Sequence, residues 1–133
     1  MNANRYFLII VMIFVFSSFK KREATLIGIW KPEYFDEKTK IATYSQSSSF
    51  KKKSAGIQFF TDGKLKVKQS TGTCGTMDAN EKINYEIVEG TWTISSDSII
   101  ELKHPLWGQN LTEKYKLKEL TENKLVVQII GLQ

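Results

Sequence analysis

The feature that most constrains the fold is a two-residue alternation of apolar and polar side chains, which recurs along most of the chain. Leu65 and Val67 alternate with lysines in the segment KLKVKQ, and Tyr115 and Leu117 do the same in EKYKLKEL. Successive side chains of a β-strand point to opposite faces of a sheet, so this period is typical of strands with one buried and one solvated face. After residue 24 no segment shows a convincing helical period. The chain is therefore predicted to be all-β.

The positions of the turn residues divide this pattern into eight strands. An antiparallel sheet of that many strands, joined up and down, tends to close on itself and so lose its exposed edges. We therefore expect an up-and-down antiparallel β-barrel of about eight strands. The predicted strands span residues 26–34, 56–60, 64–70, 82–89, 91–95, 99–104, 112–120 and 124–131.

Three short turns predict the register of three hairpins. At residues 61–63 the sequence is TDG, and glycine supplies the positive φ that ends a short hairpin loop. This turn pairs Phe59 with Leu65 and Ile57 with Val67, so that all four side chains share one face. The same reasoning at residues 96–98 and 121–123 predicts the pairs Ile94–Ile100, Trp92–Leu102, Leu117–Val127 and Tyr115–Ile129.

Gly90 interrupts the alternation. Tyr85 and Ile87 are odd-numbered, whereas the next inward residue, Trp92, is even-numbered. We expect a bulge or tight corner at residues 89–90 that resets the faces of the sheet, as glycine often does where a sheet curves. Tyr85 is then predicted to lie inside the barrel, and Glu86 on the solvated face.

The first 24 residues are interpreted as separate from the barrel domain, which is predicted to span residues 25–133. Tyr6–Phe16 contains eleven apolar residues without a charge, is preceded by Arg5, and is shorter than the ~20 residues that a spanning helix needs. This pattern is typical of a secretory signal peptide. Cleavage after Ala24 would place Arg22 at the −3 position, so an uncleaved N-terminal anchor stays an alternative. We expect an exported protein of the periplasm or cell envelope, or a secreted one.

Removal of the N-terminal segment on export would lower the net charge of the protein. The whole chain carries a net charge of +5, but residues 1–24 hold four basic residues and one acidic residue, which leaves +2 for the rest. A nearly balanced exported domain is not expected to bind nucleic acid. Contact with a membrane is expected only through an uncleaved N-terminal segment. The sequence does not indicate the oligomeric state.

A polar, serine-rich segment, Asp36–Ser54, is predicted to be one long loop that acts as a binding loop or lid. It ends in SFKKKS, Ser49–Ser54, which either is simply solvated or attracts an anionic surface or an acidic head group. Simple up-and-down connectivity places this loop at the same barrel end as Gln69–Asn80, opposite the TDG turn. The second loop contains Cys74.

Catalytic chemistry is not expected. Cys74 is the only cysteine and His104 the only histidine, and nothing in the sequence brings them together as nucleophile and base. A single cysteine forms no internal disulfide. The segment TGTCGT lacks the pattern of a phosphate-binding loop, and the chain lacks the clustered ligands of a metal site. The sequence therefore predicts no enzyme, no cofactor and no metal.

A set of short motifs resembles a known family. These are GIW at Gly28–Trp30, IQFFTDGKL at Ile57–Leu65, CGT at Cys74–Thr76 and GTW at Gly90–Trp92. Together they resemble the short lipocalin-like proteins exported by Bacteroidetes-type bacteria and, more loosely, the lipocalins, over about residues 26–130. The resemblance implies that Trp30 is structural and closes the barrel floor. It also implies that loops shape the open end and that small apolar molecules bind inside.

The aromatic residues are the candidate ligand-binding residues. Phe59, Tyr85, Trp92 and Tyr115 fall on the predicted inner faces, where they either fill the barrel or line a cavity for one small ligand. Trp107 precedes a strand and is expected at the rim if exposed, or as a plug if buried. The favoured function is binding of a small apolar or amphipathic molecule. The alternative is an envelope structural or interaction protein with a filled barrel and no ligand.

Overall fold

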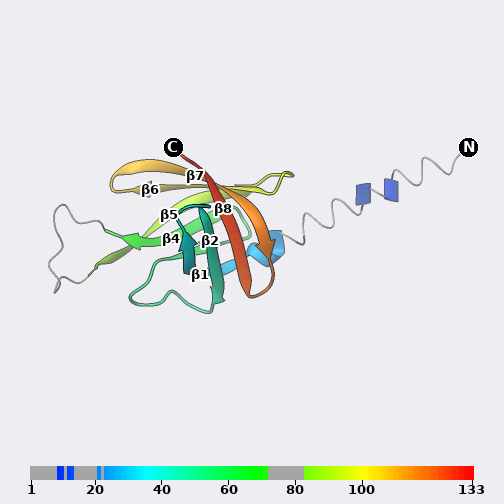
Figure 1. Cartoon of the computed structure of the whole chain (residues 1–133). Coiled ribbons are helices and arrows are strands. Elements are labelled where there is room, and N and C mark those ends of the chain that lie inside the picture. The colour runs from blue at the N-terminus through cyan, green and yellow to red at the C-terminus, as the bar shows by residue number, and fades with distance from the viewer. Residues whose placement is uncertain (1–8, 11, 14–20, 22, 72–82) are drawn as a thin grey trace, which may run out of the picture.

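Eight antiparallel strands account for most of the chain after residue 27. The computed structural model describes residues 9–10, 12–13, 21, 23–71 and 83–133. Around the barrel the strands follow the order β1-β2-β8-β7-β6-β5-β4-β3 (Figure 1). The pairing of β3 with β1 closes the barrel. The strands are β1 Gly28–Asp36, β2 Ile41–Ser47, β3 Gly56–Phe59, β4 Lys64–Ser70, β5 Tyr85–Ile94, β6 Ile99–Leu106, β7 Gln109–Leu120 and β8 Lys124–Leu132.

The predicted fold class is confirmed: the protein is a closed, eight-stranded, all-antiparallel barrel. Strands β3 to β8 form an up-and-down meander in which each strand pairs with the next. The strand order departs from a simple sequential one at a single step. β2 lies between β1 and β8, and β1 lies between β2 and β3.

The three hairpin registers are confirmed. Phe59 pairs with Leu65 and Ile57 with Val67, around a turn whose Gly63 has a φ of 79°. Each partner of these pairs is buried, as a shared inward face requires. The remaining predicted pairs also form, namely Trp92–Leu102, Ile94–Ile100, Leu117–Val127 and Tyr115–Ile129.

The prediction of one long loop over Asp36–Ser54 is wrong, because β2 lies within it. Ala42 and Tyr44 of β2 face inward and pair with Val127 and Leu125 of β8. The sequence ATYSQS lacks the apolar alternation of a half-buried strand, because its inward residues are a small alanine, a tyrosine and a glutamine, and its outward ones are polar. Pairing on both edges satisfies the backbone of this segment, so a strong apolar pattern is not needed.

The predicted reset of faces at Gly90 is also wrong. Residues 82–89 and 91–95 do not form two strands, because β5 runs without a register shift from Tyr85, opposite Ser70, to Thr91, opposite Lys64. Its even-numbered residues therefore face inward throughout. Tyr85 lies on the outer face, where the Lys68 ammonium is 5.5 Å from the centre of its ring. The predicted inner position of Tyr85 is thus wrong, and Glu86 takes the inward position instead.

Gly90 has a different role: it permits a close approach of two strands. A Cβ atom at this position would lie 2.0 Å from the Lys103 carbonyl oxygen and 2.9 Å from the His104 Cβ. β5 pairs with β6 only from Thr91 to Ile94. Glycine is thus required where β5 diverges from β6, since any side chain would overlap the β6 backbone.

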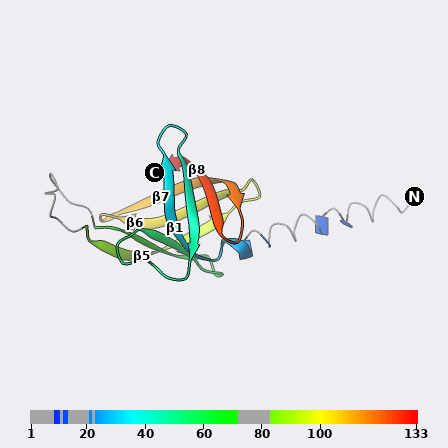
Figure 2. The same cartoon turned by 60° about the horizontal axis from the view of Figure 1, so that its bottom comes forward.

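The two ends of the barrel differ in polarity. The Trp30 end, defined by Trp30 and the turns at residues 60–63, 95–98 and 121–123, has polar turns and is covered by a helical turn at residues 23–26 (Figure 2). The opposite end carries the turns at 37–40 and 107–108 and is called the Trp107 end. The exposed large apolar residues of the barrel lie toward it, namely Tyr34, Phe35, Ile83, Ile87, Trp107, Ile130 and Leu132.

The N-terminal segment is described only in part. Within the described residues, no helix has the length and apolar character to cross a membrane. The cleavage site and the anchor alternative rest on residues that are mostly outside the described part of the chain.

We predict that Gly90→Ala lowers the free energy of unfolding by about 2 to 3 kcal/mol, because the new methyl group overlaps the Lys103 carbonyl oxygen and forces the β6 backbone to shift. Gly131→Ala is the matched control, since its Cβ would sit 3.6 Å from the Lys114 Cβ, an ordinary contact. That control should change stability by less than about 1 kcal/mol. Urea unfolding measures both, and equal effects would contradict the close approach at Gly90.

Candidate functional site

The interior of the barrel contains a cluster of four polar side chains from three strands. The alternation of each strand turns Tyr44 of β2, His104 of β6, and Glu113 and Tyr115 of β7 toward the axis. Tyr115 and His104 are 5% and 6% exposed, so the cluster is largely removed from solvent. We call these four residues the interior polar cluster.

His104 and Glu113 form the charged half of the cluster. The Nε2 atom of His104 is 2.9 Å from Glu113 Oε2, and its Nδ1 atom is 3.1 Å from the Pro105 carbonyl oxygen. A carbonyl and a carboxylate oxygen both accept hydrogen bonds, so a ring that donates to both carries a proton on each nitrogen. Burial alone would lower the pKa of His104, but the hydrogen bonds to Glu113 and Pro105 and the charge of Glu113 outweigh it and raise the pKa.

Tyr44 and Tyr115 form the neutral half. Burial raises the pKa of Tyr44 to about 12, with the Glu113 charge acting in the same direction and a hydrogen bond with Tyr115 opposing it. Burial likewise raises the pKa of Tyr115 well above 10, helped by the charges of Tyr44 and Glu113. Both phenols therefore stay protonated at neutral pH and remain hydrogen-bond donors inside the barrel.

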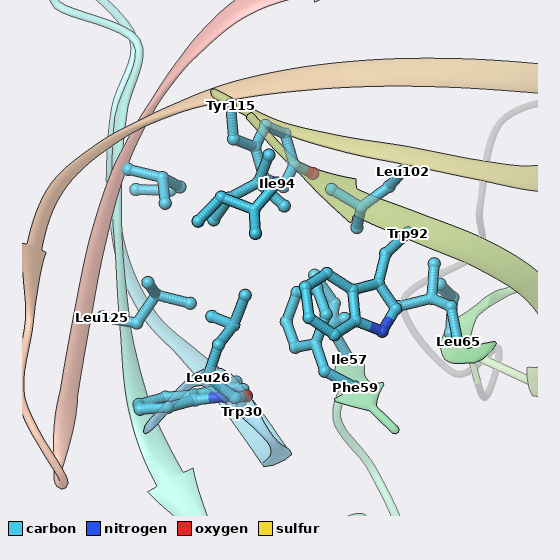
Figure 3. Close-up of a cluster of buried hydrophobic side chains, with 14 residues drawn as sticks. Leu26, Trp30, Ile57, Phe59, Leu65, Trp92, Ile94, Leu102, Tyr115 and Leu125 are labelled. Atoms are coloured by element: carbon cyan, nitrogen blue, oxygen red, sulfur yellow. The ribbon is translucent and has the colours of Figure 1, made fainter. Parts of the chain in front are cut away.

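Apolar residues occupy the interior between this cluster and the Trp30 end. The rings of Phe59 and Trp92 meet edge to face, with centroids 5.2 Å apart at 83° (Figure 3). The indole nitrogen of Trp92 donates to the Phe60 carbonyl at 3.0 Å, and that of Trp30 donates to the Leu26 carbonyl at 2.8 Å. Both N–H groups are thus satisfied by backbone, and the aromatic rings are left to apolar contacts.

The structure brings together three of the predicted ligand-binding residues. Phe59, Trp92 and Tyr115 are buried on the inner face. Tyr85 does not join them, since it faces outward. Trp30 is fully buried beside Leu26, next to the helical turn at the Trp30 end (Figure 3).

Trp107 lies at the opposite end and is 63% exposed. It occupies the two-residue turn between β6 and β7, where it has a φ of 49° and Gly108 has a φ of 81°. A bulky residue is uncommon in this region of backbone conformation. The indole nitrogen donates to the Ser70 carbonyl at 3.2 Å, which orients the ring. Of the two predicted alternatives for Trp107, the exposed rim position is the observed one.

A pocket of about 290 Å³ opens beside Trp107. It is lined by Leu106, Trp107, Gln109, Asn110, Leu111 and Gln133. Leu111 is the cross-strand partner of His104 and lies two residues before Glu113, on the same face of β7. The pocket therefore opens at the Trp107 end, beside the strand that carries Glu113 and Tyr115.

Two members of the cluster were missed by sequence reasoning. The sequence pattern places Tyr44 in the predicted loop Asp36–Ser54 and gives Glu113 no role in a site. The signal for Glu113 was present, because it is odd-numbered like Tyr115 and Leu117 in the same strand. His104 was considered only as a base for Cys74, which lies outside the described residues. Among the described residues, no group of three or more metal-ligating side chains occurs.

We predict that the imidazole of His104 titrates above its ordinary pKa of 6.5 and that Glu113→Gln brings the midpoint below that value, because burial then acts with no carboxylate to oppose it. His104 is the only histidine in the chain, so its Hε1 proton resonance reports this pKa without overlap. A midpoint that Glu113→Gln leaves unchanged would contradict the buried pair.

The same pair links stability to pH. Since the folded-state pKa of His104 is raised, its stabilisation is complete below about pH 6.5 and is lost as the pH rises through the folded pKa. Urea unfolding should therefore show the wild type losing stability over this window, and Glu113→Gln lacking the loss.

Comparison with known proteins gives one match. The family model described as a lipocalin-like domain matches residues 26–127, which covers the barrel from two residues before β1 into β8. Neither the curated proteins nor the solved structures yielded a match to this chain.

Proposed function

Because the chain belongs to the lipocalin-like domain family, we propose that it is an exported, non-enzymatic binding protein that holds one small apolar or amphipathic molecule in its barrel. A lipocalin-like barrel is a ligand-binding fold, and such proteins typically bind without catalysis. The observation that carries the proposal is the interior polar cluster, placed within an otherwise apolar barrel.

Small-molecule sites usually combine apolar walls with a few converging polar groups. Here the walls are side chains such as Phe59, Trp92 and Leu102, and the converging groups are the hydroxyls of Tyr44 and Tyr115 beside Glu113. A purely structural core gains little from such a cluster, since burying polar groups costs free energy even when they are paired. Hydrogen bonds between the tyrosine hydroxyls and a single polar group of the ligand would orient that ligand in the barrel.

The binding energy would come mainly from apolar burial. A ligand that loses ~300 Å² of apolar surface gains roughly 7 kcal/mol at ~25 cal/mol per Å², before the entropic cost of association is subtracted. The tyrosine hydroxyls add selectivity for an amphipathic molecule over a hydrocarbon, because a ligand without a polar group leaves them with fewer partners. Access would be at the Trp107 end, where the pocket beside Trp107 is lined in part by Leu111, the cross-strand partner of His104.

Export is part of the proposal and is supported by the N-terminal sequence alone. The apolar segment Tyr6–Phe16 and its flanking Arg5 have the features of a secretory signal. We expect the protein in the periplasm, in the cell envelope or outside the cell. Sequencing the N-terminus of protein recovered from those fractions distinguishes a cleaved signal, which gives a start near residue 25, from a retained anchor, which gives Met1. Recovery in the cytoplasm alone would contradict export.

The second candidate function is an interaction protein with a filled barrel. The observation in its favour is the packing at the Trp30 end, where Trp30, Phe59 and Trp92 are 0%, 2% and 6% exposed. Such a protein would use its outer face or loops and would show no saturable uptake of small molecules.

We predict that the full chain binds a fluorescent fatty acid saturably and that a long-chain alcohol displaces it. Tyr115→Phe should weaken the binding about fivefold to tenfold, since one hydrogen bond of roughly 1 kcal/mol is lost while the ring is kept. Tyr85→Phe removes an equivalent hydroxyl that lies on the outer face, so this control should leave the affinity for the ligand unchanged. Fluorescence titration and competition measure both.

Absence of saturable binding in the wild type would favour the filled-barrel candidate. Binding that Tyr85→Phe weakens and Tyr115→Phe does not would place the ligand on the outer face and contradict the interior site.

A further inference from the structure

The segment at residues 48–55 is held against the outside of the barrel by contacts of Lys68 on β4. The Lys68 ammonium donates to the carbonyl oxygens of Lys51 and Lys52, the latter at 3.2 Å. Lys68 faces outward because it lies between Val67 and Gln69, which are buried on the inner face. Figure 1 shows this segment passing below β4 and away from the strand β2 that it follows.

Phe50 makes a second contact of this segment with the barrel. Its ring lies where a Cβ atom of Gly56 would be, 2.8 Å from that position. Gly56 precedes the buried, inward-facing Ile57, so the side that Phe50 covers is the outer one. The residues between Phe50 and Gly56 are therefore fixed at both ends, and the lysines among them are presented from an anchored stretch of backbone.

Five lysines share this face and form what we call the lysine patch. Lys66 and Lys68 project from β4, and the 48–55 segment adds three exposed lysines beside them. The one acidic residue directly opposite them on β5 is Glu89, the partner of Lys66. In the described part of the chain, lysine ion pairs form elsewhere, at Lys31, Lys64, Lys103 and Lys124. The patch comprises Lys51, Lys52, Lys53, Lys66 and Lys68.

Apolar residues border the lysine patch on β5. Ile87 is the cross-strand partner of Lys68 and is 54% exposed, and Tyr85 lies two residues before it under the Lys68 ammonium. A polyanion in water would gain nothing from an exposed isoleucine. A lipid bilayer has both an anionic surface and an apolar layer just beneath it, and proteins that lie on it combine lysines with apolar side chains in this way.

We propose that the lysine patch and Ile87 form a docking surface for a bilayer that contains anionic phospholipids. The exposed lysines of the 48–55 segment approach the phosphate groups, Lys68 holds that segment in place, and Ile87 enters the boundary with the acyl chains. The surface is on the outer face of β4 and β5, so it is distinct from the interior polar cluster. It does not depend on the proposed ligand, and each is tested separately.

Sedimentation of the full chain with vesicles tests the proposal. The wild type should bind vesicles of phosphatidylglycerol and phosphatidylcholine in equal parts more tightly than vesicles of phosphatidylcholine alone. The triple variant Lys51→Gln, Lys52→Gln, Lys53→Gln should reduce binding to the anionic vesicles at least about tenfold, since each lysine near such a surface contributes substantially. Added salt should reduce wild-type binding and affect the triple variant less.

Two matched controls exclude a general effect of charge or apolar exposure. The variant Lys114→Gln, Lys116→Gln, Lys118→Gln removes the same charge from the outer face of β7 and should bind like the wild type. Ile87→Ser should weaken binding about threefold or more, whereas Ile130→Ser, at a residue 50% exposed on β8, should not. The N-terminal apolar segment is present in every variant and contributes equally to all.

Three results would overturn the proposal. The first is equal binding of the wild type to both kinds of vesicle. The second is equal loss in the two triple lysine variants, which would indicate a general charge effect. The third is a Lys51–Lys53 variant that still binds vesicles but no longer binds a soluble polyanion such as polyglutamate. This result would identify the partner as an acidic polymer instead. Circular dichroism of each variant verifies that the barrel is folded.

Discussion

The pairing of β1 with β2 on one edge and with β3 on the other is the constraint on which the rest of the structure depends. β1 is antiparallel to both, so β2 and β3 run in the same direction. Strands that run in the same direction need a connection that travels back along the sheet. In this chain that connection is the 48–55 segment, which lies outside the barrel and presents the lysine patch.

The same constraint determines the interior site. One edge of β1 pairs with β2 and the other with β3, so β1 has no edge left for β8. The free edge of β2 pairs with β8 instead, and this pairing closes the barrel on that side. This places Tyr44 of β2 beside Tyr115 of β7, across β8. One irregularity of strand order therefore generates both the interior polar cluster and the outer docking surface. A strictly sequential barrel would have put neither in its present position.

The parts of this structure that sequence reasoning predicted are local. A turn such as TDG and the alternation on either side of it are separated by a few residues, and together they define which side chains share a face. Phe59 with Leu65 and Trp92 with Leu102 follow from that information alone. The burial of Phe59, Trp92 and Tyr115, and hence most of the apolar wall of the candidate site, follows as well.

The parts that were missed depend on contacts between distant segments. The inward apolar residues of β2 are limited to Ala42 and Tyr44, so it is recognisable as a strand only through its neighbours β1 and β8. At Gly90 the apparent break in alternation arises because Tyr85 and Ile87 are apolar yet face outward, beside Lys68. A prediction that assigns every apolar residue to the buried face therefore places these two residues on the wrong side of the sheet. The exposed position of Ile87 is instead part of the proposed docking surface.

The proposed function requires that an amphipathic molecule lies inside the barrel against the interior polar cluster. Intermolecular nuclear Overhauser effects from a bound long-chain alcohol test it most directly. We expect contacts from the alkyl chain to Trp92 and Leu102, and from the carbon that carries the hydroxyl to Tyr44 and Tyr115. Contacts confined to outward residues such as Tyr85 and Ile87, at saturating alcohol, would contradict it.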